Sequence, residues 1–350
     1  MSSNLNLPED RLNTLSRAED VGTGNVELDA VARHRDAELI ADEVEARAEE
    51  LASIGGGVVD APRSLWLDAW SDLRRRPLFW VSLILIVVFV TMALFPQLFT
   101  NRDPLYCNLK ESRTPPGPGH LFGTDLLGCD VYSRTIYGAR ASISVGVLAT
   151  LATTMLGMTV GTFAGYFGGW VDSLLSRLGE IFSAIPLLLG GIVILYTFPS
   201  QIDTPFFVQV GKVVLTLMVL GWPSVARLMR SSVLQVKPNE YVLAARALGA
   251  GPMRTIHSHV MPNAIAPVIA VATINLGAYI TTEASLSFLG IGLRPPIISW
   301  GGAISEASGL GYIMAAPYML LFPAIFLSLT VLGFMTLGEC VREAIDPKSH

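Results

Sequence analysis

"RRRPLFWVSLILIVVFVTMALFPQLF", residues 74–99, sets the fold class of this chain of 350 residues. Residues 78–99 form an apolar run without a charged side chain. An α-helix needs about 20 such residues to cross the hydrocarbon core of a bilayer. Three consecutive arginines, at positions 74–76, stand directly before the run. The pattern predicts a membrane-spanning helix that begins on the cytoplasmic side, because Lys and Arg are enriched there.

Composition extends this prediction to most of the chain. Apolar residues make up 51% of it and charged residues only 15%, whereas soluble domains carry about a quarter charged residues. Six runs are long enough to span a membrane, at about residues 78–99, 141–171, 181–202, 204–226, 260–284 and 307–338. We therefore expect an all-α membrane protein with six transmembrane helices. An even number of spans places both termini on one side of the membrane, and the arginines at 74–76 indicate that this side is the cytoplasm.

Charge divides the chain into regions. Residues 1–60 contain 14 Asp and Glu against 5 Arg, so they are expected to form an acidic cytoplasmic extension, partly helical or disordered. A regulatory or docking role for the extension is the alternative. Residues 61–76 have apolar residues at helical spacing before the arginines, which predicts an interfacial amphipathic helix. The membrane domain, 77–345, would contain an outside loop at 100–140 and a cytoplasmic loop at 227–259.

A polar island, "EYVLAARALGAGPMRTIHSHVMPN" at residues 240–263, lies in that cytoplasmic loop. Asn239 suits a helix N-cap, and Glu240 in the first turn complements the helix dipole. Gly249, Gly251 and Pro252 predict the helix end. We therefore expect a short helix on the cytoplasmic face, and a solvated helix without a partner is the alternative. Its candidate contact residues are Glu240, Tyr241, Ala244, Ala245, Arg246, Leu248 and Gly249.

Cysteine, acid and histidine residues supply the other candidate sites. Cys107 and Cys129 share the outside loop, where a disulfide can form, although two free thiols or a transient pair are alternatives. Glu283 is expected near the outer end of the fifth span, with a structural hydrogen-bonding role or a place on the substrate path or gate. His257 and His259 are two positions apart, so a helix would point them apart rather than toward one metal ion.

Catalytic motifs are missing from the sequence. No phosphate-binding G-x-x-x-x-G-K-[ST] run, H-E-x-x-H motif or nucleophile elbow occurs, so we expect neither catalytic residues nor a metal site. A secondary transporter driven by ions would need acids within the spans and inverted repeats. The nearly uncharged runs make this the remote alternative.

Motif order resembles that of one transporter family. Glu240, Ala244, Ala245, Gly249 and Pro262 fit the "EAA…G…I.LP" loop of ATP-binding cassette (ABC) importer permeases. The string "HLFGTDLLGCDVYSRTIYGARASISVG" is similar to that of C-type permeases of the dipeptide/oligopeptide/nickel family. Cys129 departs from the usual Arg, and Met261 from the usual Leu. The resemblance covers roughly residues 64–347, and the acidic extension has no counterpart in it.

This resemblance implies a fold, an activity and partners. The fold would be that of a type I ABC importer permease, importing dipeptides or oligopeptides, or alternatively a nickel or metal chelate or an antimicrobial peptide. A homologous second permease, two ATPase domains that hold ATP and Mg, and an extracellular or periplasmic solute-binding protein would be the partners. No nucleic acid is expected. The chain would lie in the bacterial plasma (inner) membrane and bind no cofactor.

By the same resemblance, the 240–263 loop would be the coupling helix that docks into an ATPase subunit. Glu240, Ala244, Ala245 and Gly249 would be contact positions. On the other side, the solute-binding protein would meet the outside loop. Its polar network is expected to comprise Asp125, Asp130, Arg134 and Arg140.

Overall fold

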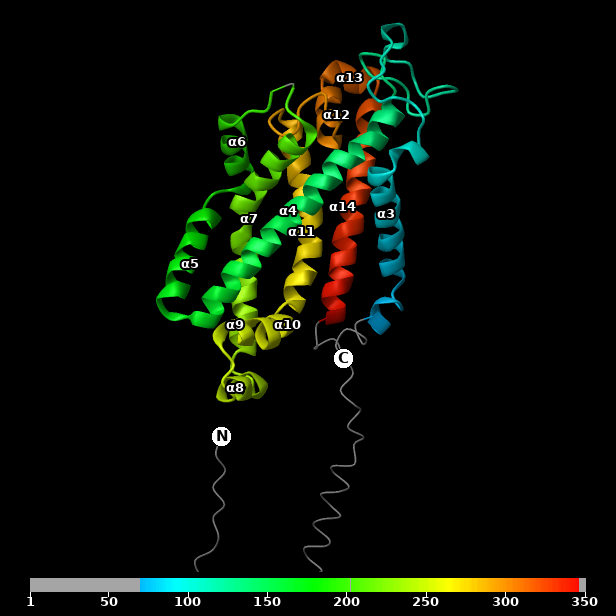
Figure 1. Ribbon diagram of the computed structural model, residues 1–350. Coiled ribbons are helices and arrows are strands. Elements are labelled where there is room, and N and C mark those ends of the chain that lie inside the picture. Colours follow the sequence, from blue (N-terminus) through cyan, green and yellow to red (C-terminus); the bar gives the residue numbers. More distant parts are fainter. Residues whose placement is uncertain (1–69, 202, 346–350) are drawn as a thin grey trace, which may run out of the picture. The chain divides into compact units, whose positions relative to one another are not determined.

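The computed structural model describes residues 70–201 and 203–345, and these ranges fold into helices and loops without a strand (Figure 1). The predicted acidic extension, 1–60, lies outside the described residues. So does most of the predicted interfacial helix, 61–76, of which residues 70–73 are helical.

Four helices are long and apolar enough to cross a membrane: α3 (Pro77–Leu94), α4 (Val131–Phe167), α7 (Phe206–Val236) and α14 (Tyr318–Ile345). Two bent pairs can supply two further crossings, namely α5 (Gly169–Ser183) with α6 (Leu187–Thr197), and α9 (Pro252–Thr255) and α10 (Met261–Ala264) with α11 (Ala266–Phe288). The predicted all-α membrane fold is confirmed, with four to six candidate spans in the described residues.

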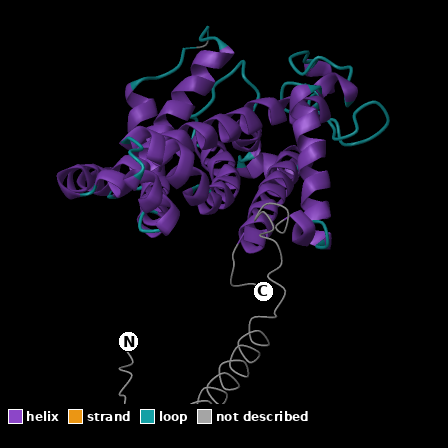
Figure 2. Ribbon diagram, turned by 60° about the horizontal axis from the view of Figure 1, so that its bottom comes forward, coloured by secondary structure: helices purple, strands orange, loops and turns teal. Residues whose placement is uncertain are grey.

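Short elements occupy the two ends of the helix bundle. One end carries α8 (Glu240–Ala247), α9, a π-helical turn (Ile256–Val260) and α10, and we call it the α8 end. The other end carries the loop after α3, with 3₁₀ turns at Pro96–Leu98 and Leu109–Glu111, and helices α12 (Trp300–Ala307) and α13 (Leu310–Ala315). We call it the loop end (Figure 2).

Prolines mark both bends. The axes of α5 and α6 differ by 82°, and Pro186 is the N-cap of α6. The α9–α10 pair meets α11 at 60°, with Pro262 in α10 and Pro267 in the first turn of α11. Proline lacks the amide hydrogen that would continue a helix. The segments that contain the predicted spans 181–202 and 260–284 are therefore bent in the structure.

Helix boundaries also differ from the apolar runs. Helix α4 begins at Val131 instead of 141, α7 continues to Val236 instead of 226, and α14 begins only at Tyr318 instead of 307. The first two helices are longer because charged side chains at their ends have partners: Arg134 pairs with Asp125, and Arg230 pairs with Asp172 at 2.5 Å. The predicted loops 100–140 and 227–259 are correspondingly shorter.

Helices α4 and α7 share the most extensive contact of any helix pair in the described bundle. Gly157, Gly161 and Gly165 recur every four residues on α4, so they share one face. A Cβ atom on any of them would come within 3.0 Å of an α7 atom, and at Gly161 within 2.4 Å of the Ala226 carbonyl oxygen. Glycine thus lets the two backbones touch, as in other membrane helix pairs.

Candidate functional site

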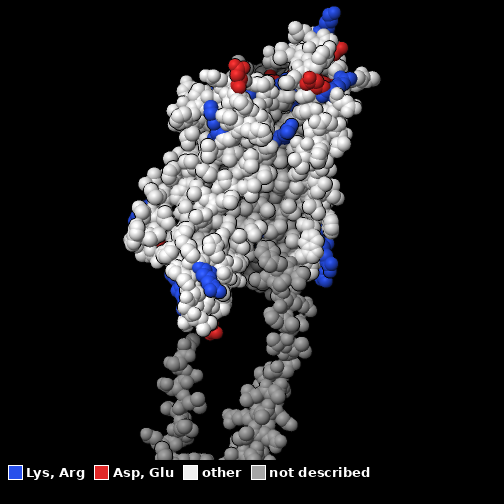
Figure 3. All heavy atoms as spheres, viewed as in Figure 1, with Lys and Arg blue, Asp and Glu red and all other residues white. Residues whose placement is uncertain are grey.

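Charged side chains in the described bundle gather mostly toward its two ends. Figure 3 shows blue and red atoms near the loop end and the α8 end, with a broad uncharged band between them on that face. Such a band is what a helix bundle needs to lie in hydrocarbon. Functional polar groups are therefore sought first at the two ends.

Helix α8 is a short helix with a well-formed end. Asn239 occupies the N-cap position, but its side chain forms no capping hydrogen bond. At the other end, the Ala250 amide donates to the Ala245 carbonyl at 3.0 Å and the Gly249 amide to the Arg246 carbonyl at 2.9 Å. These two bonds form a Schellman motif, and Gly249 has the positive φ, 87°, that the motif requires.

One side of α8 is anchored in the bundle and the other is exposed. Val242 is fully buried in a cluster with Val233 and Ile256. Leu248 is 89% exposed, and Tyr241, Glu240 and Ala244 are also exposed. Leu243, which is 51% exposed, belongs to the same apolar surface although helical spacing did not single it out. Helix α8 protrudes from the helix bundle (Figure 1), and its exposed side chains include apolar ones.

Arg246 and Ala245 lie differently from the expected contact face. Both are half-buried. The guanidinium carbon of Arg246 lies 4.8 Å from the centroid of the Tyr166 ring, and its Nε is buried without a hydrogen-bond partner. Arg246 therefore contacts the end of α4 instead of extending toward an outside acid. The two loop histidines, His257 and His259, belong to no metal-binding group within the described ranges.

At the loop end, a disulfide joins Cys107 to Cys129. The two chain segments that the disulfide joins also pair through the backbone, where the Asn108 amide donates to the Gly128 carbonyl at 3.2 Å. Gly128 has a φ of 76°, and a Cβ there would lie 1.9 Å from the Asn108 carbonyl oxygen. Only glycine fits this position, so the crossing of the two segments depends on it.

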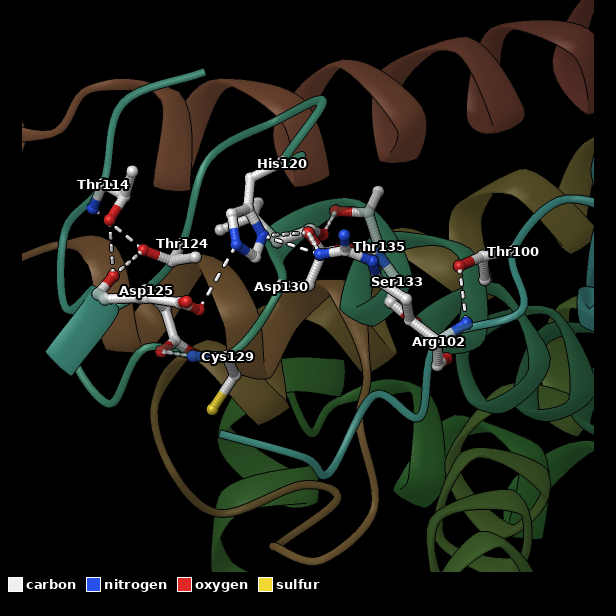
Figure 4. Close-up of polar contacts among 12 residues, drawn as sticks. Thr100, Arg102, Thr114, His120, Thr124, Asp125, Cys129, Asp130, Ser133 and Thr135 are labelled. Carbon is white, nitrogen blue, oxygen red and sulfur yellow. Dashed lines mark hydrogen bonds and ion pairs between the residues drawn. The ribbon is translucent and has the colours of Figure 1, made fainter. Parts of the chain in front are cut away.

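Two acids of the loop between α3 and α4 bind backbone amides and cations (Figure 4). Asp125 accepts from the amides of Leu127 and Cys129 and pairs with Arg134, which also reaches Glu306 at 3.0 Å. Asp130 caps α4 by accepting from the Ser133 amide at 2.9 Å. Of the four residues expected to form one polar network, the structure pairs Asp125 with Arg134, whereas Asp130 has other partners.

His120 is a member of this network that sequence reasoning missed. Its Nδ1 lies 2.8 Å from Asp130, its Nε2 lies 3.4 Å from Glu111, and Arg102 also reaches Nδ1 at 2.9 Å (Figure 4). His120 and Asp130 are ten positions apart, and no local spacing rule would pair them. The glycines around the turn at 117–123 bring the ring back over the start of α4.

Arg140, by contrast, stays outside the network. It lines a cavity of about 940 Å³ at the loop end, together with Tyr137 of α4. Residues 97–105, 203–206 and 296–298 form the other walls. Within the described ranges Arg140 forms no ion pair. Arg140 is therefore the cation that α4 contributes to this cavity.

Glu283 is fully buried near the end of α11 instead of reaching the membrane interface. Its Oε1 accepts from the Ser287 hydroxyl at 2.7 Å, and that hydroxyl in turn accepts from the Leu293 amide at 3.0 Å. Its Oε2 has no hydrogen bond of good geometry, although the hydroxyls of Ser142 and Ser299 lie close enough to interact with the carboxyl group. The contacts favour the structural role over a place on a substrate path.

Comparison with known proteins agrees with this architecture. Residues 157–350 match the family described as "Binding-protein-dependent transport system inner membrane component", and residues 64–116 match the "N-terminal TM domain of oligopeptide transport permease C".

Three relatives cover most of the chain. The oligopeptide transport system permease protein OppC of Bacillus subtilis (strain 168) is 38% identical over 81% of this chain and 90% of its own length. The dipeptide transport system permease protein DppC of Alkalihalophilus pseudofirmus is 35% identical over the same shares. The glutathione transport system permease protein GsiD of Escherichia coli O6:K15:H31 is 31% identical over 83% of this chain and 92% of its own length. The chain therefore belongs to the family of binding-protein-dependent transport system inner membrane components.

Proposed function

We propose that this chain is a permease subunit of an ATP-driven importer of oligopeptides or dipeptides. The observation that carries the proposal is the similarity to OppC and DppC over about four-fifths of the chain, including both ends of the helix bundle. The names of these relatives include oligopeptide, dipeptide and glutathione transport, and all three substrates are peptides.

In this proposal α8 is the contact with an ATPase subunit that holds ATP and Mg. Its exposed apolar residues, Tyr241, Leu243 and Leu248, would enter the ATPase, and Glu240 would lie at the rim. Exposed apolar side chains cost free energy in water and are typical of interfaces. The α8 end would then face the cytoplasm, with both termini, and the loop end would face outward.

A second permease and a solute-binding protein complete the proposed assembly. The disulfide-linked loop, its Asp125 and Asp130 networks and the cavity lined by Arg140 would meet the loaded binding protein. ATP binding would shift the pair of permeases between two conformations, and substrate would pass between them. The chain itself needs no catalytic residue for this work, because the linked binding equilibria supply the free energy.

Purification of the assembled complex tests the proposal. The chain is co-expressed with a candidate ATPase, second permease and binding protein from the same genome, and the complex is reconstituted in proteoliposomes. We expect ATP hydrolysis that rises with loaded binding protein, together with uptake of a labelled oligopeptide. Stimulation by a nickel chelate but by no peptide would overturn the substrate, and failure of any ATPase to copurify would overturn the importer.

A pair of variants tests the docking helix in the same preparation. Leu248→Asp places a charge on the exposed face of α8, so it should release the ATPase from the detergent-solubilised complex. Leu109→Asp is the matched control, because Leu109 is 72% exposed at the loop end. Equal loss of ATPase from both variants would contradict docking through α8.

A further inference from the structure

The aromatic ring of Tyr166 lies where three helices meet. Tyr166 is in the last turn of α4, is only 8% exposed, and packs with Val233 of α7 and Val242 of α8. The last turn of α4 lies at the α8 end of the described bundle (Figure 1). Tyr166 of α4 therefore directly links α8, the proposed docking helix, to the α4–α7 pair.

Two cations converge on this residue. The Arg246 guanidinium of α8 lies over the ring at 4.8 Å, and the Lys237 ammonium that follows α7 lies 5.7 Å from the same centroid. Cation–π attraction acts within about 6 Å and strengthens when the pair is removed from water. The buried Arg246 Nε, which has no hydrogen bond, shows that its guanidinium is partly removed from water.

Lys237 also binds the backbone of α4. Its Nζ donates to the Tyr166 carbonyl oxygen at 2.7 Å. The last four carbonyls of a helix have no partner within the helix, and a cation there also complements the helix dipole. The end of α4 is thus tied to the end of α7 through the Tyr166 backbone, and to α8 through the Tyr166 ring.

The helices that Tyr166 joins to α8 form a close pair. The glycine face at positions 157, 161 and 165 leaves no room between the α4 and α7 backbones. At its other end, α4 begins at Val131, and the N-cap residue Asp130 binds His120 of the loop between α3 and α4. A displacement of α8 is therefore passed to a tightly packed helix pair that reaches the disulfide-linked loop.

We propose that Tyr166 is the positioning residue that transmits the movement of α8 to the α4–α7 pair, through its contact with Arg246. This inference rests on the proposed function, because α8 moves only if an ATPase binds it. Without the ring, α8 would keep its buried Val242 and its chain connections but lose the contact that orients it on α4. Docking would persist while coupling failed.

Three substitutions in the complete complex test the role of the ring. Tyr166→Phe keeps an aromatic face, Tyr166→Leu removes it, and Phe167→Leu is the matched control on a neighbouring ring over which no cation lies. We expect Tyr166→Leu to keep bound ATPase and to hydrolyse ATP, while peptide uptake per ATP falls at least about tenfold. The other two variants should stay within about twofold of the wild type. An unchanged ratio in Tyr166→Leu would overturn the proposal.

Arg246 gives an independent reading of the same contact. Arg246→Lys keeps a cation and should retain most coupling, whereas Arg246→Gln should behave like Tyr166→Leu. Equal uptake per ATP in these two variants would contradict a cation–ring contact. Loss of the ATPase itself from Tyr166→Leu would show a merely structural role and would also overturn the proposal.

Hydrogen–deuterium exchange separates this inference from the proposed function. The full chain in nanodiscs is compared with Tyr166→Leu and Tyr166→Phe, without any transport assay. We expect faster exchange of the α8 amides only in Tyr166→Leu. Identical exchange in all three chains would overturn the proposed role of Tyr166 even if peptide import is confirmed. A wild-type complex that imports no peptide would instead refute the proposed function.

Discussion

Glu283 is a buried acid whose hydrogen-bond partner is local. Its carboxyl group accepts from Ser287, and Ser287 accepts from the Leu293 amide in the segment after α11. Glu283 thereby orients the Ser287 hydroxyl so that it accepts a hydrogen bond from the segment that follows α11. A buried polar group that loses its partner costs about 1–3 kcal/mol.

We predict that Glu283→Gln leaves the protein folded and assembled, whereas Glu283→Leu lowers its stability by about 1–3 kcal/mol. The amide oxygen of Gln can still accept from Ser287, and Leu cannot. Thermal unfolding followed by gel filtration in detergent measures the difference. Equal damage by both substitutions would show that the acid itself is needed, and a harmless Leu would show that the contact is unimportant.

Single residues also show where sequence reasoning stops. The motif around Arg246 located a surface helix, but the direction of the Arg246 side chain depends on Tyr166, which is 80 positions away. Arg140 was grouped with nearby acids and instead lines the cavity. Local spacing describes one helix, whereas side-chain partners come from helices that only the fold brings together.

At the scale of elements, the contact between α4 and α7 depends on small residues. Gly161→Ala would place a methyl group 2.4 Å from the Ala226 carbonyl oxygen, so the helices must separate. We predict a loss of about 1–3 kcal/mol of stability from this overpacking.

Gly211→Ala serves as the control for that prediction. Gly211 lies in α7 with open space where the Cβ would go. Because Ala favours a helix over Gly by up to about 1 kcal/mol, this variant should be neutral or slightly more stable. Melting temperatures of the two purified variants decide the matter, and similar values would argue against close backbone packing.

The disulfide in the loop between α3 and α4 leads to a prediction about the number of reactive thiols. The chain has three cysteines, of which Cys107 and Cys129 are bonded and Cys340 is free and buried. Denatured protein that has not been reduced should therefore accept one alkyl group, and reduced protein three. Mass spectrometry counts the adducts. Three adducts without reduction would show that the disulfide is absent from the protein.

Apolar runs located the membrane elements but not their directions. A count of uncharged residues predicted one span at 181–202, where the structure has α5 and α6 meeting at 82°. The length of an apolar run indicates whether a segment can cross the membrane. It does not indicate whether the helix is bent. The apolar run at 204–226 also stopped at Arg227, although α7 continues because Arg230 pairs with Asp172 of α5.

At the scale of the whole described bundle, its two ends differ in chemistry. The loop end has a disulfide, buried acids and a cavity, while the α8 end has a protruding helix with an apolar surface. Helix α4 connects them without interruption from Val131 to Phe167. The described bundle therefore offers two separate contact regions that share one long helix.

Labelling of intact cells tests the proposed orientation. In a Cys340→Ala background, Leu109→Cys should react with a membrane-impermeant maleimide from outside, because residue 109 is exposed in the loop that the proposed orientation places outside. Leu248→Cys should react only after the cells are permeabilised. The opposite pattern would reverse the orientation and remove α8 from the side that holds ATP.

The disulfide sets an order for making the protein. In the proposed orientation, Cys107 and Cys129 reach an oxidising compartment only after the segment between α3 and α4 has crossed the membrane. Maturation of this loop is therefore a late, extracytoplasmic event, separate in time from insertion of the helices. Production of the importer in a host would depend on the thiol-oxidising capacity of that host, and not only on its translocation machinery.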